Sequence, residues 1–343
     1  MTHSERVLKT LNFKETDRVP CDLMEGSVWK ELMNYFRDKY GFNDVIQILN
    51  FLDTDFRWIY TRYEGPKPSI SVTEKDHVIY SNPVAEGPLA TARTIADIEA
   101  YDFPDPLWWQ IPDFADFRNK WQDYAIVFLP GWMPLFWSSC LAFGMEGALV
   151  KMVEEPKIYE AFVMRQHEFY MDILTRGVKA GRGICDICWL GDDFSSQKAM
   201  LMNPDLWRKY IKPYLAEQVQ LARDNDMFVF YHSCGSVRQI LPDLIDMGVN
   251  ALLVFQTKST GMDVQSVVRD FGGKLAFYGG IDIQQILSYG TPDDVVSEVR
   301  KNIEAFENYG GYIVANSHHG VSTIKGENIE AMFQAVRMEE NSE

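Results

Sequence analysis

From Trp121 onward, this chain alternates short apolar runs with longer segments whose apolar residues recur at helical spacing. The apolar runs are Ala125–Leu129, Ile184–Leu190, Met227–Tyr231, Ala251–Phe255, Leu275–Gly279 and Tyr312–Ala315. The helical segments are Met145–Val150, Ile158–Lys179, Pro204–Arg223, Val237–Met247, Val264–Phe271, Pro292–Phe306 and Glu327–Arg337. Because alternation of this kind is typical of parallel strands joined by crossover helices, the pattern predicts an α/β fold.

The region before Trp121 is less regular. It contains predicted strands at Arg18–Leu23 and Phe56–Tyr60, a strand or hairpin at Ser69–Ile79, and helices at Ser4–Leu11, Val28–Tyr40 and Val45–Phe51. Ser4 is a possible cap of the first helix. Residues 83–112 are rich in Pro and Asp, with one short helical piece near residues 95–101, which predicts a long excursion over the surface or over a site.

The number of predicted strands approaches the eight of a closed barrel. We therefore expect one (β/α)8 TIM-barrel domain over residues 1–343, with an irregular N-terminal region and loop insertions, rather than an open doubly wound sheet. No glycine-rich phosphate-binding motif follows a predicted strand, which also argues against a nucleotide-binding open sheet.

The chain is acidic, with a net charge of −16, which disfavours nucleic acid and anionic membrane surfaces as partners. Its most apolar stretch, Ile126–Met152, is interrupted by Pro130, Pro134 and Glu146, so no membrane-spanning helix is expected. The charged N-terminus lacks the apolar core of a secretory signal, and five cysteines without framework spacing fit a reducing compartment. We expect a cytoplasmic enzyme, with a homodimer as the common state of such proteins.

The strongest chemical feature is His232-Ser233-Cys234, which follows the apolar run ending at Tyr231. Because side chains alternate along a strand, His232 and Cys234 can face one point at the strand's carboxyl end, where barrel enzymes assemble their sites. His318 and His319 follow the last apolar run in the same way. Two imidazoles and a thiolate with an open fourth position suit catalytic zinc, although buried His and Cys are more often structural.

Carboxylates and amides follow the other strands. Asp192 and Asp193 form a pair of which one member could act as ligand, base or orienting group while the other caps the next segment, and loop solvation is an equally good interpretation. Gln256 and Asp282 occupy analogous positions, and Asp22 and Glu25 lie beyond the first predicted strand. Cys185 and Cys188 have redox-motif spacing, but i and i+3 face opposite ways on a strand, so core packing is the better interpretation.

Aromatic residues are concentrated outside the regular helices. Core filling is the usual role of such residues, but in loops near barrel strands they can wall an apolar substrate pocket. The candidates for this role are Trp132, Phe136, Trp137 and Trp189, together with Glu25 beyond the first strand.

Several of these blocks, in this order, resemble the uroporphyrinogen decarboxylase superfamily, and within it the zinc-dependent, corrinoid-linked methyltransferases. The matching blocks are Glu5-Arg6-Val7-Leu8, Asp17-Arg18-Val19-Pro20, Gly191-Asp192-Asp193-Phe194, Asn203-Pro204 to Pro213-Tyr214, His232-Ser233-Cys234-Gly235, Gly279-Gly280-Ile281-Asp282 and Glu327-Asn328-Ile329. The resemblance implies a (β/α)8 barrel with its funnel at the carboxyl ends of the strands.

The resemblance also implies a zinc site. Methyltransferases of this kind hold zinc with an H-x-C pair and a later Cys, which map onto His232, Cys234 and His318, with His319 as the alternative if the loop is one residue shorter. The expected reaction moves a methyl group between a small donor and cob(I)alamin or methylcobalamin on a separate corrinoid protein. A methoxylated aromatic donor is favoured over a methylamine, methanol or a thiol.

The alternative reaction is metal-free decarboxylation of a porphyrinogen. Decarboxylases of this superfamily carry an arginine-rich stretch after the first strand to bind the carboxylates of their substrate. This chain has Leu23-Met24-Glu25-Gly26-Ser27 there, and Glu25 would repel a polyanion.

Overall fold

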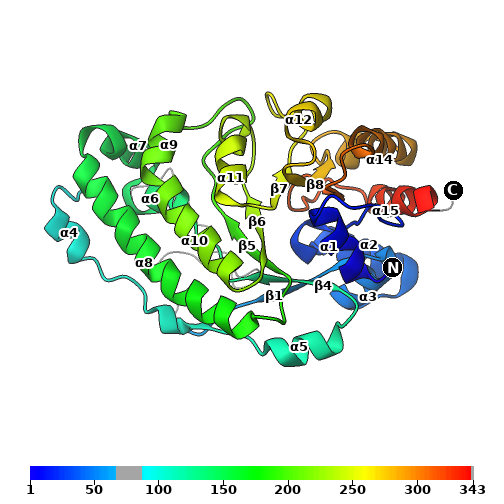
Figure 1. Ribbon diagram of the computed structural model, residues 1–343, viewed down its shortest axis with the longest axis horizontal. Helices are drawn as coiled ribbons and strands as arrows, with labels where there is room; N and C mark the ends of the chain where they lie inside the picture. Colours follow the sequence, from blue (N-terminus) through cyan, green and yellow to red (C-terminus); the bar gives the residue numbers. More distant parts are fainter. Residues whose placement is uncertain (67–86, 341–343) are drawn as a thin grey trace.

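The computed structural model describes residues 1–66 and 87–340, and its centre is a curled sheet of parallel strands (Figure 1). The strands neighbour one another in chain order, as expected when each is joined to the next by a crossover. They are β1 (Phe56–Tyr60), β4 (Ala125–Leu129), β5 (Ile187–Gly191), β6 (Phe228–His232), β7 (Ala251–Phe255), β8 (Ala276–Ile281) and β9 (Tyr312–Asn316). A separate antiparallel pair is formed by β2 (Arg62–Tyr63) and β3 (Trp109–Gln110).

The segment around Cys21 fills the gap between the first and last strands of the sheet. The Asp22 amide donates to the Val314 carbonyl at 3.0 Å, and the Asp55 amide donates to the Cys21 carbonyl at 2.9 Å. The predicted strand at residues 18–23 is therefore reduced to a single bridge, because Pro20 has no amide hydrogen and the chain turns at once into the short helix η1 (Met24–Gly26). The prediction of a TIM-barrel-like fold is confirmed.

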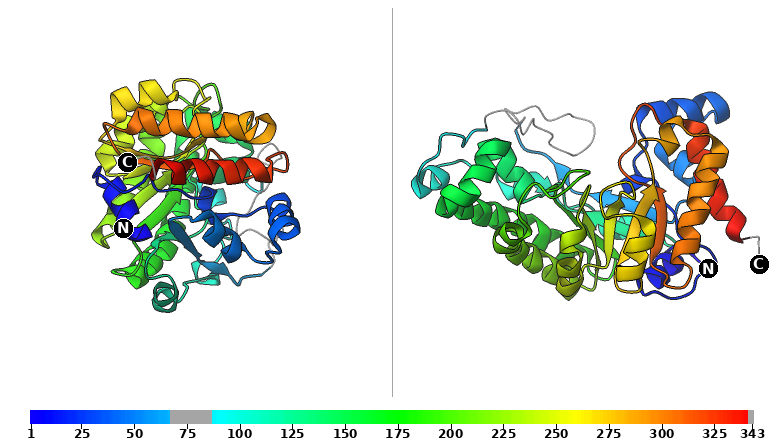
Figure 2. Two further views of the ribbon diagram at one scale, coloured as in Figure 1. Left: turned by 90° about the vertical axis from the view of Figure 1, so that its right-hand side faces the viewer. Right: turned by 90° about the horizontal axis from the view of Figure 1, so that it is seen from above.

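Helices surround the sheet. They are α1 (His3–Leu11), α2 (Lys30–Tyr40), α3 (Val45–Leu52), α4 (Ile95–Glu99), α5 (Phe114–Lys120), α6 (Phe136–Phe143), α7 (Met145–Glu154), α8 (Pro156–Gly181), α9 (Pro204–Tyr210), α10 (Lys212–Asp224), α11 (Leu241–Met247), α12 (Val264–Phe271), α13 (Ile286–Tyr289), α14 (Pro292–Phe306) and α15 (Gly326–Glu340), with short helices η2 (Pro106–Trp108) and η3 (Arg238–Ile240). Figure 2 shows α4 and α6–α8 on the side of the barrel opposite α14, α15 and both termini.

Several element boundaries differ from those predicted. Thr2, not Ser4, caps α1, because its side chain accepts from the Glu5 amide while the Glu5 carboxylate accepts from the Thr2 amide. Helix α6 was missed because it is apolar on most sides and has no capping side chain of its own at Leu135. The predicted strand or hairpin at Ser69–Ile79 lies outside the described residues.

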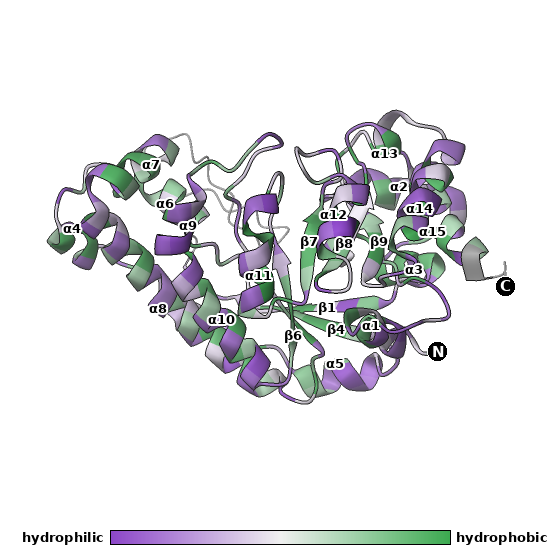
Figure 3. Cartoon of the chain, turned by 45° about the horizontal axis from the view of Figure 1, so that its top comes forward, coloured by the Kyte–Doolittle hydropathy of each residue, from purple (hydrophilic) through white to green (hydrophobic). Residues whose placement is uncertain are grey.

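The core has two layers, one between the sheet and the helices and one inside the barrel. The strands supply both, because alternate residues such as Trp58 and Phe230 point inward while Val229 and Tyr231 face the helices. Hydrophobic residues are concentrated on the strands, whereas the outer helices carry both hydrophobic and hydrophilic residues (Figure 3). His232 continues the inward series on β6, so the fold delivers it to the barrel's interior.

Among residues 1–66 and 87–340, no helix combines the length and the apolar character needed to cross a bilayer.

Candidate metal centre

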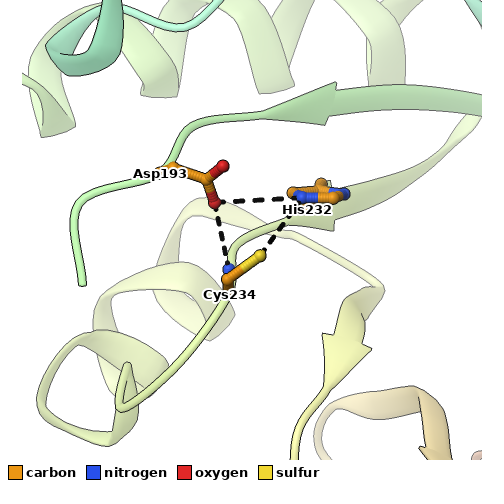
Figure 4. A group of neighbouring side chains, drawn as sticks. All are labelled: Asp193, His232 and Cys234. Carbon is orange, nitrogen blue, oxygen red and sulfur yellow. Dashed lines mark hydrogen bonds and ion pairs between the residues drawn. The ribbon is translucent and has the colours of Figure 1, made fainter. Parts of the chain in front are cut away.

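Three side chains converge where β5 and β6 end (Figure 4). Asp193 follows β5, His232 is the last residue of β6, and Cys234 comes two residues later. His232 Nε2 lies 3.6 Å from Cys234 Sγ and 3.9 Å from Asp193 Oδ1. One ligand atom from each residue lies within 4.8 Å of the others, and within the described ranges no other His, Cys, Asp or Glu residues form such a group.

These three donors fit a zinc ion. Zinc accepts imidazole nitrogen, thiolate sulfur and carboxylate oxygen, and catalytic zinc sites hold it with three protein ligands and leave one position for substrate. Cys234 and His232 were predicted as ligands. For the Asp192–Asp193 pair the sequence left three roles open, those of ligand, base and orienting group, and Asp193 was named as a catalytic residue. Asp193 joins the donor group because it follows β5, which is paired with β6, so that its side chain lies at the same carboxyl end of the barrel, here called the mouth.

The loop that carries Cys234 is held by its surroundings. The Cys234 amide donates to Asp193 Oδ1 at 3.3 Å, and the Gly235 amide donates to Gln256 Oε1 at 2.8 Å. Gly235 has φ 82°, and a Cβ there would lie 2.4 Å from the Ser196 carbonyl oxygen, so only glycine fits. Burial, and then the Asp193 charge, raise the pKa of Cys234 well above its usual value. A bound cation would offset both effects by stabilising the thiolate.

The other ring nitrogen of His232 contacts Glu25. His232 Nδ1 lies 2.9 Å from Glu25 Oε1, which also accepts from Trp189 Nε1 at 3.0 Å. Glu25 Oε2 lies 3.0 Å from His319 Nε2. Burial alone would raise the pKa of Glu25, but His319 and the hydrogen bonds from both histidines hold it well below its usual range. Glu25 therefore accepts hydrogen bonds as a carboxylate.

His318 and His319 both reach this region after β9. The ring centroid of His318 is 6.4 Å from that of His232, and the ring centroid of His319 is 6.3 Å from it. Burial, together with the neighbouring His319 and His232, lowers the pKa of His318 to about 4. Its imidazole is thus neutral at pH 7 and has a lone pair to offer a metal.

A family model described as uroporphyrinogen decarboxylase (URO-D) matches residues 138–338, which is more than half of the chain. The chain belongs to the URO-D family. The matched residues include Asp193, His232, Cys234 and both histidines after β9. The resemblance inferred from the sequence motifs is therefore confirmed.

Comparison with a solved methyltransferase structure agrees on the fold. The URO-D chain is similar to a methyltransferase from Methanosarcina mazei, with a TM-score of 0.69 and 19% identity over 98% of this chain and 99% of that chain. An L-ribulose 3-epimerase aligns with a TM-score of 0.46 and 10% identity over 94% of this chain and 92% of that chain. A search of curated protein sequences finds no match.

The remaining polar residues predicted for the site of this URO-D chain have backbone partners in the structure. The Asp192 carboxylate accepts from the amides of Leu135, Phe136 and Trp137 at 2.7–3.0 Å, which caps α6. Asp282 accepts from the amides of the two residues at 284 and 285 at 3.0 Å. Gln256 supports Gly235, as described above. These contacts give all three residues a role in holding the backbone around the candidate metal site.

The predicted aromatic residues divide into two groups. The rings of Trp132 and Trp189 lie 5.4 and 5.5 Å from the His232 ring and form a wall beside it. Phe136 is fully buried in the outer core layer, and the Trp137 amide is one of those bound by Asp192. Neither Phe136 nor Trp137 lines the large cavity described next, although both were predicted to contact substrate.

Trp132 also borders a cavity of about 450 Å³ between α6, α8 and residues 101–109. Nearly half of its lining residues are aromatic, and the lining contains Asp102 but no Lys, Arg or His among the described residues. The aromatic lining residues are Tyr63, Tyr101, Phe103, Trp108, Trp109, Trp132, Phe162, Phe169 and Tyr170.

Sequence reasoning missed the residues that hold Glu25. The Glu25 amide donates to the Tyr278 hydroxyl at 3.2 Å, and the Tyr60 hydroxyl donates to the Glu25 carbonyl at 2.8 Å. The preceding Met24 amide donates to Asn316 Oδ1 at 2.9 Å. Inward-facing polar side chains on otherwise apolar strands were the available signal, since a buried hydroxyl or amide needs a partner.

Proposed function

We propose that this chain is a zinc-dependent methyltransferase that moves a methyl group between a small donor and the corrinoid of a separate protein. The observation that carries the proposal is the convergence of His232, Cys234 and Asp193 at the mouth of a URO-D barrel. Support of a weaker kind comes from the similarity in fold to a methyltransferase.

His232 Nε2, Cys234 Sγ and Asp193 Oδ1 would hold the metal in this scheme. His318, predicted as the third ligand from the family resemblance, offers a neutral imidazole from the loop after β9 and is the candidate for a further position. When bound, the metal supplies Lewis-acid polarisation of the donor's heteroatom. Trp132 and Trp189 cover one side of His232 and exclude water from that side.

A methoxylated aromatic compound is the donor that the surroundings favour. Trp132 is shared between the His232 wall and the aromatic cavity, and an aromatic ring is the ligand that such a lining binds best. The reaction would convert the methyl ether and cob(I)alamin, with one proton, into the free phenol and methylcobalamin. Methylamines, methanol and thiols are the other donors to be tested.

Decarboxylation of a porphyrinogen is the alternative within the family. It is disfavoured because Glu25, rather than an arginine, follows the first strand segment, and because no Lys or Arg in the described part of the chain lines the aromatic cavity. A substrate with many carboxylates would lack partners there.

The test is a spectroscopic assay of cob(I)alamin methylation with methoxyaromatic, amine, alcohol and thiol donors. We expect turnover with a methoxyaromatic donor that stops on chelation and returns with added zinc. The matched control is Cys188→Ala, which removes a buried thiol remote from the mouth, whereas Cys234→Ala should abolish activity. Chelator-insensitive turnover, or consumption of a porphyrinogen, would refute the proposal.

A further inference from the structure

Glu25 is a charged residue at the centre of this site to which the proposed reaction gives no role. Its side chain is almost fully buried, and it contacts three side chains from three different strands or their ends. Oε1 lies against Trp189 Nε1 and His232 Nδ1, and Oε2 lies against His319 Nε2. A buried carboxylate is costly unless it is paired in this way, so these contacts are the reason that it can stay there.

The backbone at Glu25 is strained in a way that aims the carboxylate. Glu25 has φ 54° and ψ 30°, in the left-handed region that non-glycine residues rarely occupy, and Gly26 follows with φ 64°. Hydrogen bonds with Tyr278 and Tyr60 hold its amide and carbonyl, and Asn316 holds the amide before it. Such strain persists only where several surrounding contacts hold the backbone in place, and it is found mostly at functional sites.

The geometry points to Glu25 as a positioning residue for the metal centre, with different roles for the two histidines after β9. The carboxylate accepts from His232 Nδ1–H, which leaves the Nε2 lone pair directed at Cys234 and Asp193. His319 has Nε2 on Glu25 and Nδ1 3.5 Å from Ser27 Oγ, so both of its nitrogens face protein groups. His318, rather than His319, is then the histidine of this pair that can serve the metal.

This inference rests on the proposed function, because that function supplies the metal. The first measurement needs no metal and is therefore independent of it. In the metal-free protein, ¹⁵N chemical shifts of histidine report which ring nitrogen carries the proton. We expect His232 protonated on Nδ1 in the wild type, and a mixture of tautomers in Glu25→Gly. Glycine suits the left-handed backbone here, so this variant removes the carboxylate without adding strain.

The second measurement is affinity for Zn²⁺, with X-ray absorption of the loaded protein. Loss of a carboxylate that orients a metal-bound histidine costs about 10- to 100-fold in metal affinity. We expect a loss of this size in Glu25→Gly, partial recovery with added formate, an intermediate affinity in Glu25→Gln, and unchanged first-shell scatterers in all of them. His319→Ala should weaken binding less than His318→Ala, which should also remove a nitrogen scatterer.

Two results would overturn the inference. A lost oxygen scatterer in Glu25→Gly would make Glu25 a direct ligand, and an unchanged His232 tautomer with unchanged affinity would leave it without a positioning role. If the wild type binds no zinc, the proposed function fails, whereas the tautomer measurement still decides whether Glu25 orients His232.

Discussion

Asp22 and Glu25 lie three residues apart in the same barrel interior, yet their carboxyl groups behave in opposite ways. Glu25 has histidine partners that keep it ionised, whereas burial raises the pKa of Asp22 to about 7 despite hydrogen bonds from Trp58 and Tyr278. Both of those bonds go to Oδ2, and Oδ1 has no partner. Oδ1 is therefore the oxygen on which a proton would reside.

The raised pKa of Asp22 predicts a pH-dependent cost to stability. Between about pH 4 and 7 the folded chain keeps a proton that the unfolded chain has released, so stability falls as pH rises through this window. Asp22→Asn mimics the protonated group, and its stability relative to wild type should rise from near zero at pH 4 to about 4 kcal/mol at pH 8. Urea unfolding across this range measures the difference. The exposed Asp38→Asn is the control, and parallel curves for Asp22→Asn and wild type would contradict the assignment.

At the scale of elements, the mouth of the barrel depends on a helix that has no cap of its own. Helix α6 begins at Phe136, and its first amides are satisfied by Asp192 from the end of β5. The same residue orders the backbone leading into Asp193, whose amide donates to Asp192 Oδ1 at 2.9 Å. One carboxylate thus links the start of α6 to the candidate metal ligand.

Asp192→Ala should destabilise the fold by about 1–3 kcal/mol, because it leaves buried amides unpaired. Hydrogen exchange at residues 135–137 should speed up in this variant, and urea unfolding should give the loss of stability. Asp193→Ala is the matched control, since its side chain is 29% exposed and its carboxylate lies against His232 and the Cys234 amide. Equal exchange rates in the two variants would show that Asp192 does not cap the helix.

At the scale of the whole molecule, Asp55 joins the elements that close the barrel. Its buried carboxylate accepts from Arg6 of α1 at 2.5 Å, from Arg18 at 2.8 Å and from the Cys21 amide at 2.8 Å. α1 in turn places Val7 and Leu11 in the interior core layer. The cluster therefore ties α1 and the Cys21 segment to the start of β1.

Removing this carboxylate should take the buried partner from two buried arginines, which keep the partly exposed Asp17 and Asp53. We expect Asp55→Ala to lower the free energy of unfolding by about 3–5 kcal/mol, as for other broken buried ion pairs. Asp53→Asn, which removes the charge of a partly exposed partner of Arg18 and suits the left-handed backbone at this position (φ 59°), should cost less than about 1 kcal/mol. Denaturant titration compares the two, and similar small losses would show that the cluster does not hold the barrel closed.

Sequence periodicity predicted the barrel because each strand carries its own apolar run, as at Ala125–Leu129, where prediction and structure coincide. It also predicted that His232 and Cys234 face one point, since this depends only on local alternation. The bond between Trp189 and Glu25 joins residues 164 positions apart, and no local pattern encodes such a contact. The same holds for the capping of α6 by Asp192, because Asp192 follows β5 and lies 56 positions after Phe136 in the chain.

The central claim is that the mouth of this barrel holds zinc, and elemental analysis of the purified chain tests it most directly. We predict about one zinc per chain in the wild type, in keeping with the one donor group found within residues 1–66 and 87–340. His232→Ala and Cys234→Ala should lose the metal while their far-UV circular dichroism stays that of the wild type. A wild type without metal, or variants that retain it in full, would contradict the account.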